Sequence, residues 1–537
     1  MSSYVGDQTL LLAALAGGAA LIFLLAQKLS GHDPREPPLA RPSIPIIGHL
    51  VGMARQGFNY PVDLCRKMNS PSVYTMNLAG QKMYVATKPD LIQTVQKQPK
   101  ILAFEPIAAK FSNVVCGVGK EAGDAMHRNI FGDEPGPSLF VAWHKLTYEA
   151  LRPGPGLDAL NRIMIKNVAE SLDKIAPANA RDHRTIGMTS WLRDTITQAT
   201  TRAVYGPNNP FEDPAIAEAF WEFEAGFMAI VANVLPAITA RKALAARDKV
   251  ANAIEAYYRN GGIDGASGVT KARYTTGLDS NIPLCDIAQF EVGGTIAVLV
   301  NTTPATFWTL FMLHAHPGLR DHVRKEIDAC TLTSISKGPY GSEVITKTVE
   351  ITSLKSTCPL LLSAYQETLR YKSMGTSVRE VVQDTKLDGY LLKKGAMLQM
   401  PTRIIHTDES VWGPTVMEYN PRRFLPEEKA NRPKDFCFRS FGGGKTLCPG
   451  RHFATNEVLA VVAVFLSRFD MQPVDEAKGW EEPTAFNTNV ASVMMEPDVD
   501  FKVKIKLREG FENVKWDVRL DGGDKVFAMV TEDIAEA

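Results

Sequence analysis

Three consecutive glycines, Gly442 to Gly444, stand just before a single cysteine, Cys448, and a run with helical character follows. Glycine loses more conformational freedom on folding than any other residue, so this run predicts a tight turn or a backbone that approaches something flat or bulky. Backbone N–H groups and a helix dipole at such a turn stabilise a thiolate. The plain alternative is an ordinary loop that holds a buried, inert cysteine.

A stabilised thiolate most often serves a metal. The chain has seven cysteines, and no two have the C-x-x-C spacing that is typical of structural zinc and cysteine-ligated iron–sulfur sites. A haem iron remains, because the porphyrin nitrogens supply the equatorial ligands and one thiolate suffices. The scattered, odd set of cysteines also fits a reducing compartment better than a disulfide framework.

The segment FRSFGGGKTLCPGRHFA, residues 438–454, resembles the cysteine signature of the cytochrome P450 family. The resemblance implies a mainly α (α+β) cytochrome P450 fold, helix-rich with small marginal sheets. It also implies that Cys448 is the metal ligand of a haem b iron. The signature positions are Phe441, Gly444, Cys448, Gly450 and Ala454, and we expect Phe441, Gly444, Lys445, Cys448 and Gly450 to bind the cofactor.

Thr446 departs from the family pattern, which usually has a basic residue there for a haem propionate. The resemblance implies Arg379 as one propionate contact, since it lies where the family places such a cation. Trp143 resembles the start of the family's W-x-x-x-R element. The position of the arginine in that element is occupied here by Thr147, which is not basic. His144 or Lys145 would then have to substitute, or they belong to a solvated basic surface.

Glu367 and Arg370 have the i, i+3 spacing that places two side chains on one helical face. Alone, such a pair is usually a surface ion pair. The later string YNPRRF, residues 419–424, resembles the family's P-E-R-F segment, with Arg422 in place of the glutamate. The resemblance implies a structural triad of Glu367, Arg370 and Arg423 that holds the scaffold of the cysteine loop.

Residues 284–328 form a long apolar segment with Asn301, Thr302, Thr303 and Pro304 at its centre. Proline removes a helical hydrogen bond, so this pattern predicts a kinked buried helix. It also suits a helix that opens where a cofactor and oxygen must fit.

By resemblance, this segment is the distal haem helix, which usually carries an acid–alcohol pair. Val300 and Asn301 occupy the positions of that pair, and the string NTTPATFW is similar to the subgroup of cholesterol 7α-hydroxylase, sterol 12α-hydroxylase and prostacyclin synthase. We therefore expect Asn301 and Thr302 to be the catalytic residues that order water near the bound oxygen.

Residues 8–28 form an uncharged apolar run that is long enough to cross a bilayer. Asp7 precedes the run and basic residues follow it, which favours a cytosolic globule. A signal peptide or a buried helix is the alternative. We expect a transmembrane anchor over 1–30, a proline-rich hinge over 31–50, a catalytic domain over 51–510 and a C-terminal extension over 511–537, in the endoplasmic reticulum membrane.

Periodicity predicts mostly helices in the globule. Strand patterns are short and lie early and late in the chain. The predicted helices include 157–175, 188–204, 214–240 and 242–259, the predicted strands lie within 73–87, 349–353, 386–400 and 500–507, and residues 515–530 are predicted to form a hairpin around Asp521.

The chain carries 59 basic and 59 acidic side chains, and this balance argues against nucleic-acid binding. The resemblance implies a monooxygenase that oxidises a lipophilic, steroid- or terpenoid-like substrate, and we expect it to act in a secondary-metabolite pathway. NADPH would supply electrons through a cytochrome P450 reductase, which a surface near Lys445, Arg451 and His452 would receive. The alternatives are a haem-thiolate isomerase that needs no reductase and a non-catalytic haem sensor.

Overall fold

The computed structural model describes residues 31–42, 44, 47–78, 80–177, 182–338, 342–486, 489 and 491–521. The chain divides into two compact units. The first contains Met1–Ile107 and Thr376–Ile405, and the second contains Ala108–Gly375 and His406–Ala537. Helices predominate and the sheets are small, which confirms the predicted fold class. The expected N-terminal anchor lies outside the described residues.

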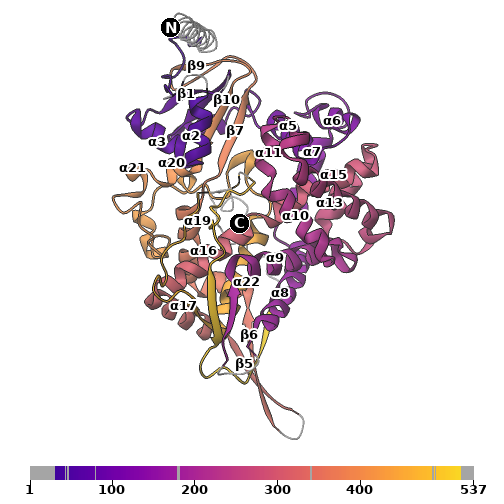
Figure 1. Cartoon of the computed structure of the whole chain (residues 1–537), viewed down its shortest axis with the longest axis vertical. Coiled ribbons are helices and arrows are strands. Elements are labelled where there is room, and N and C mark those ends of the chain that lie inside the picture. Colours follow the sequence, from indigo (N-terminus) through magenta and orange to yellow (C-terminus); the bar gives the residue numbers. More distant parts are fainter. Residues whose placement is uncertain are drawn as a thin grey trace, which may run out of the picture. The chain divides into compact units, whose positions relative to one another are not determined.

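The first unit is built on a five-stranded sheet with the order β1-β2-β10-β7-β3 (Figure 1). The pairing of β10 with β2 is parallel, and the other neighbours are antiparallel. Two further strands, β8 and β9, form a small ladder of their own. The elements are α2 (Gly48–Gln56), α3 (Asn59–Lys67), β1 (Val73–Leu78), β2 (Gln81–Ala86), α4 (Pro89–Gln96), β3 (Leu102–Ala103), β7 (Thr376–Val381), β8 (Thr385–Leu387), β9 (Tyr390–Leu392) and β10 (Met397–Pro401).

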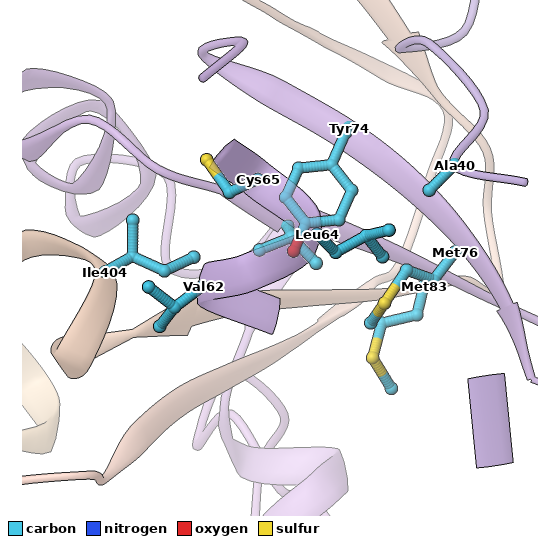
Figure 2. Close-up of a cluster of buried hydrophobic side chains, with 9 residues drawn as sticks. Ala40, Val62, Leu64, Cys65, Tyr74, Met76, Met83 and Ile404 are labelled. Carbon is cyan, nitrogen blue, oxygen red and sulfur yellow. The ribbon is translucent and has the colours of Figure 1, made fainter. Parts of the chain in front are cut away.

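Apolar side chains from α3, β1 and β2 form a core cluster in this unit (Figure 2). Tyr74 lies inside it, and its hydroxyl donates to the carbonyl of Pro61 at 2.9 Å. Part of the proline-rich segment joins the same unit. Ala40 belongs to the cluster, and the buried Glu36 carboxylate pairs with Lys82 at 2.7 Å.

The second unit contains most of the helices (Figure 1). Helix α5 (Glu105–Cys116) runs into it from the first unit, and α20 (Thr402–His406) enters it again. Its other elements are α6 (Lys120–His127), α7 (Leu139–Ala150), α8 (Pro155–Ile175), β4 (Arg184–Gly187), α9 (Met188–Tyr205), α10 (Pro214–Ala225), α11 (Phe227–Ala232), α12 (Pro236–Thr239), α13 (Arg241–Arg259), α14 (Gly268–Asp279), α15 (Leu284–Leu299), α16 (Thr302–Ala315), α17 (Pro317–Cys330), β5 (Leu332–Lys337), β6 (Glu343–Glu350), α18 (Ile351–Thr357), α19 (Pro359–Lys372), α21 (Glu409–Trp412), α22 (Arg451–Arg468), β11 (Phe469–Pro473), β12 (Lys502–Leu507) and β13 (Val514–Arg519).

The core of the second unit is formed around α16 and α22, which pack against each other and are buried along almost their whole lengths. Helix α16 also packs against α9 and α19. The stretch Leu284–Ala315 is long and apolar enough to span a membrane, but 78% of its most apolar part is buried inside the protein. It is therefore a core helix.

This core helix is interrupted, as the sequence predicts. Helix α15 ends at Leu299 and α16 begins at Thr302, so Val300 and Asn301 lie in the break. Pro304 has no N–H group to donate to the Val300 carbonyl, and this loss accounts for the interruption.

Three of the predicted helices are confirmed as α8, α9 and α13. The predicted helix 214–240 is instead divided into α10, α11 and α12. Asn233 and Leu235 adopt left-handed backbone angles there and Pro236 follows, so a continuous helix cannot form.

One strand prediction needs correction, and one is untested. The strand predicted at 349–353 ends at Glu350, whose carboxylate accepts from the N–H groups of Thr352 and Ser353 and so begins α18. In the expected C-terminal hairpin, β13 pairs in parallel with β6. The return strand of that hairpin lies outside the described residues, so the hairpin stays a prediction.

Candidate functional site

The cysteine loop folds back on itself immediately before α22. The N–H of Cys448 donates to the carbonyl of Phe441 at 2.9 Å, which closes the loop around the glycines. Gly442 has a φ of 80°, and a β-carbon there would lie 2.6 Å from the carbonyl oxygen of Thr446. The turn therefore requires glycine at this position. The expected tight turn is present.

The Cys448 thiol is enclosed by protein but keeps some accessible surface. Burial raises its pKa, while the N–H of Gly450 and the charge of Arg451 act in the opposite direction. In the protein alone, burial favours the neutral thiol. A bound metal cation would favour the thiolate.

Helix α7 lies beside the cysteine loop, since the Tyr148 hydroxyl donates to the carbonyl of Leu447. Trp143 is on the same helix, and its ring packs edge-on against Phe290 with centroids 5.0 Å apart. The indole Nε1 of Trp143 is buried and has no hydrogen-bond partner among the described residues. His144 and Lys145 are exposed, so they are less suited than Trp143 to an enclosed anionic group.

The structure brings Glu367, Arg370 and Arg423 together. Arg370 donates from Nε and Nη2 to the two oxygens of Glu367, both at 2.8 Å, and Arg423 Nε lies 3.2 Å from Glu367 Oε2. Glu367 and Arg370 are buried, whereas a surface pair would be solvated. The expected ionic triad is thus formed in space.

A chain of hydrogen bonds leads from this triad to the cysteine loop. Arg370 donates to the carbonyl of His406 at 2.8 Å, and His406 Nδ1 lies 3.1 Å from the carbonyl of Arg370. The other ring nitrogen of His406 accepts from the N–H of Arg439 at 3.0 Å. Since Arg439 precedes the glycines by three residues, the triad supports the start of the loop.

Arg439 itself is a cation that the sequence analysis did not single out. It is buried, although an arginine in a glycine-rich loop is usually expected to be exposed to solvent.

Arg379 is in the first unit, on β7, where it is also buried. Its guanidinium carbon lies 5.5 Å from the centroid of the Phe104 ring. Its contact with a propionate stays a prediction.

A surface that would receive the reductase is predicted near Lys445, Arg451 and His452. Two of these three residues are not at the surface. Lys445 is exposed, but Arg451 and His452 are buried in the first turn of α22. Arg451 donates from Nη1 to the carbonyl of Cys448 at 3.3 Å, so it stabilises the loop.

Asn301 ties the break in the core helix to a C-terminal segment. Its Oδ1 accepts from the N–H of Val493 at 2.7 Å, and the carbonyl of Val493 accepts from the N–H of Met374 at 2.8 Å. The acceptor oxygen of Asn301 is thus engaged, and its amide N–H groups are the atoms with which it can act on water.

Thr302 lies next to a buried acid that the sequence analysis missed. The Glu457 carboxyl on α22 accepts from the Thr200 hydroxyl at 2.5 Å, and its second oxygen is buried without a hydrogen-bond partner among the described residues. The nearby Thr302 hydroxyl also acts on this carboxyl. Burial raises the pKa of Glu457 to about 8, although both hydroxyls lower it. Glu457 is the single acid of α22 and stands just before an apolar run, but the sequence does not show which side chains surround it.

These features fit a haem group. Cys448 offers a thiol in a partly exposed residue, the glycines allow close approach, and Trp143 presents an unpartnered buried N–H that suits an anionic oxygen. No group of three or more histidine, cysteine or acidic side chains among the described residues could hold a bare metal ion.

Comparison with known proteins points the same way. The family model described as "Cytochrome P450" matches residues 286–503. A cytochrome P450 monooxygenase of Hypoxylon pulicicidum, nodJ, is 34% identical over 93% of this chain and 95% of its own length. Cytochrome P450 7B1 of Mus musculus is 26% identical over 87% of this chain and 89% of its own length.

The structure of the retinoic acid-bound cyanobacterial protein CYP120A1 superposes with a TM-score of 0.68. The match covers 89% of this chain and 100% of that chain at 18% sequence identity. At this identity, the likeness establishes the shared fold.

Proposed function

Since this chain belongs to the cytochrome P450 family, we propose that it is a haem-thiolate monooxygenase acting on a lipophilic, steroid- or terpenoid-like substrate. NADPH would deliver electrons through a cytochrome P450 reductase. The observation that carries the proposal is Cys448, held by a glycine-closed loop whose start is supported by the buried triad. Haem bound to this thiolate would supply the redox chemistry that activates O2.

In this proposal, the protein positions and polarises the cofactor. The loop presents the Cys448 sulfur, and the Trp143 indole N–H donates to a propionate. Buried Arg439 offsets the negative charge of the propionates, since Thr446 cannot do so. These contacts depend on a rigid scaffold, because the removal of one partner from a buried ion pair is costly.

Proton delivery is assigned to Thr302 and Glu457. Val300 has no ionisable group, and Asn301 cannot ionise. Because its pKa is raised to about 8, Glu457 remains mostly protonated at neutral pH and can donate to the Thr302 hydroxyl. Thr302 and the amide N–H groups of Asn301 would hold the water that passes the proton on.

We place the protein in the endoplasmic reticulum membrane as a single-pass protein with a cytosolic catalytic domain. The apolar run over residues 8–28 supports an anchor. Exposed apolar side chains on and between α11 and α12 support a second contact with lipid, and they are Met228, Val234, Leu235 and Ile238. A membrane location suits a lipophilic substrate.

A haem-thiolate isomerase is the second candidate, because the usual acid–alcohol pair is replaced by Val300 and Asn301. The proximity of Glu457 to Thr302 favours the monooxygenase, since an acid and an alcohol still lie near each other at the helix break. An isomerase needs no external electrons. A sensor would bind haem without turnover.

Turnover of a steroid and terpenoid panel, with and without NADPH and reductase, distinguishes the three functions. The proposal predicts oxygenated product only when both are present. Full product without them would establish the isomerase, and a haem protein with no turnover of any substrate would favour the sensor.

The proton path is tested by product and hydrogen peroxide formed per NADPH. Thr302→Val and Glu457→Gln should each lower product per NADPH on the order of tenfold, which corresponds to about 1.4 kcal/mol. Thr309→Val is a matched control, because Thr309 is a buried threonine of the same helix that donates to its own helix, to the carbonyl of Ala305. Unchanged coupling in both test variants would exclude this path.

A further inference from the structure

Two cysteines outside the haem site lie against each other in the second unit. Cys330 is the last residue of α17, and Cys358 is the N-cap of α19. Their sulfur atoms are 3.7 Å apart. Cys358 is buried, whereas Cys330 is partly exposed. A reagent in solution therefore has access to one member of the pair.

The surroundings favour ionisation of one thiol of the pair. The Cys358 thiol, with the hydroxyls of Thr357 and Ser353, lowers the pKa of Cys330 below the usual range of a cysteine. The contact with Cys330 and burial raise the pKa of Cys358. Of the two sulfurs, that of Cys330 is therefore the more readily ionised, and the thiolate is the nucleophilic form of cysteine.

A disulfide has a sulfur–sulfur distance of about 2 Å, so the two side chains need to approach by roughly a further 2 Å. We propose that Cys330 and Cys358 form a peroxide-oxidisable dithiol that closes to a disulfide between α17 and α19. The oxidant is hydrogen peroxide, and the site is independent of the haem chemistry proposed above.

The reaction balances in two steps. The Cys330 thiolate attacks one oxygen of hydrogen peroxide, the O–O bond breaks, and Cys330 sulfenic acid and hydroxide form. The Cys358 sulfur then attacks the Cys330 sulfur, its proton and the sulfenic hydroxyl leave as water, and the disulfide forms. The two sulfurs together lose two electrons and the peroxide gains them. A thiol such as glutathione reverses the reaction by exchange.

The disulfide would enclose the β5–β6 hairpin and α18 in a covalent loop. It would also tether the start of α19, the helix that carries Glu367 and Arg370. Oxidation should therefore raise the unfolding temperature of the wild-type protein, because it restricts the unfolded chain.

The test uses the full-length holoprotein. It is treated with hydrogen peroxide, its remaining thiols are alkylated, and it is digested without reductant. We expect a peptide pair joined through Cys330 and Cys358, two hydrogen masses lighter than the two thiol peptides, that separates after dithiothreitol. Cys285→Ser is the matched control, because Cys285 is exposed and outside the pair, and this variant should keep the cross-link.

In Cys358→Ser, dimedone should trap a sulfenic acid at Cys330, and the rise in unfolding temperature should disappear. The wild-type experiment does not depend on the folding of any variant. The proposal is overturned if Cys330 and Cys358 remain fully alkylatable after peroxide oxidises Cys285. It is equally overturned if Cys330 forms only sulfinic acid or only cross-links between chains.

Discussion

Glu367 is the residue on which the scaffold below the cysteine loop converges. Its carboxylate receives Arg370, Arg423 and the N–H of Asn420, and it is completely buried. Two guanidinium groups thus depend on one carboxylate for charge compensation. A buried arginine that loses its carboxylate is left with an uncompensated charge in a medium of low dielectric constant.

Glu367→Gln should lower the free energy of unfolding by about 3–5 kcal/mol and reduce haem content, because the arginines lose their counter-charge. Chemical denaturation and the haem-to-protein ratio measure both effects. Glu409→Gln, at an exposed position, should change stability by less than about 0.5 kcal/mol. Equal stability of the two variants would show that the triad does not support the fold.

Glu457 gives a prediction about pH. Its pKa is about 8 in the folded protein, and its ordinary value is 4.5. Between these pH values the folded state binds more protons than the unfolded state, so this residue makes stability fall as pH rises. The loss begins above about pH 4.5 and is complete above about pH 8.

The free energy of unfolding is measured for the wild type and for Glu457→Gln at pH values across this window. The difference between the two proteins gives the contribution of Glu457 to stability. The stability of the wild type relative to the variant should fall by roughly 5 kcal/mol, since one pKa unit corresponds to about 1.4 kcal/mol. A difference that stays constant with pH would mean that Glu457 is not protonated in the fold.

At the scale of elements, the break between α15 and α16 is anchored by Asn301. Asn301→Ala removes the acceptor for the Val493 N–H, worth about 1 kcal/mol, and should raise amide exchange at Val493 roughly fivefold. Asn301→Asp retains an acceptor oxygen and serves as the control. Hydrogen exchange followed by mass spectrometry measures the change. Wild-type exchange in Asn301→Ala would show that this hydrogen bond does not hold the segment.

The break was predictable, because Pro304 removes a specific N–H. The division of the predicted helix 214–240 was predictable only in part, since Pro236 is a helix breaker but the left-handed angles of Asn233 and Leu235 leave no clear local signal. The parallel partner of β13 was also hidden, because β6 is far away in sequence. Local periodicity reports which face of an element is apolar, and it does not report a distant partner.

In the site too, residues with a local sequence motif were predictable, and residues that depend on distant partners were not. Cys448, Glu367, Arg370 and Arg423 stand in recognisable motifs, and the structure brings the last three into contact. Glu457, Thr200 and Arg439 could not be selected from sequence, because their significance depends on burial by other helices. Arg451 and His452 were misread for the same reason, since charge suggested a surface position.

At the scale of the whole molecule, the sequence predicts an anchor that is separable from the catalytic domain. Deletion of residues 1–30 should release most of the protein from membranes while haem stays bound, because the proposed anchor is an independent apolar segment. Membrane flotation and the absorbance spectrum report the two properties. Loss of haem in the truncated protein would indicate that the segment packs into the globule.

The central claim is that Cys448 is the axial ligand of a haem iron. The ferrous carbon monoxide spectrum of wild type and Cys448→Ser tests it, with Cys437→Ser as the matched control for a buried cysteine. The wild type and Cys437→Ser should show the long-wavelength Soret band of a thiolate complex, and Cys448→Ser should lose it, because a serine hydroxyl is a far weaker donor. Persistence of this band in Cys448→Ser would contradict the account.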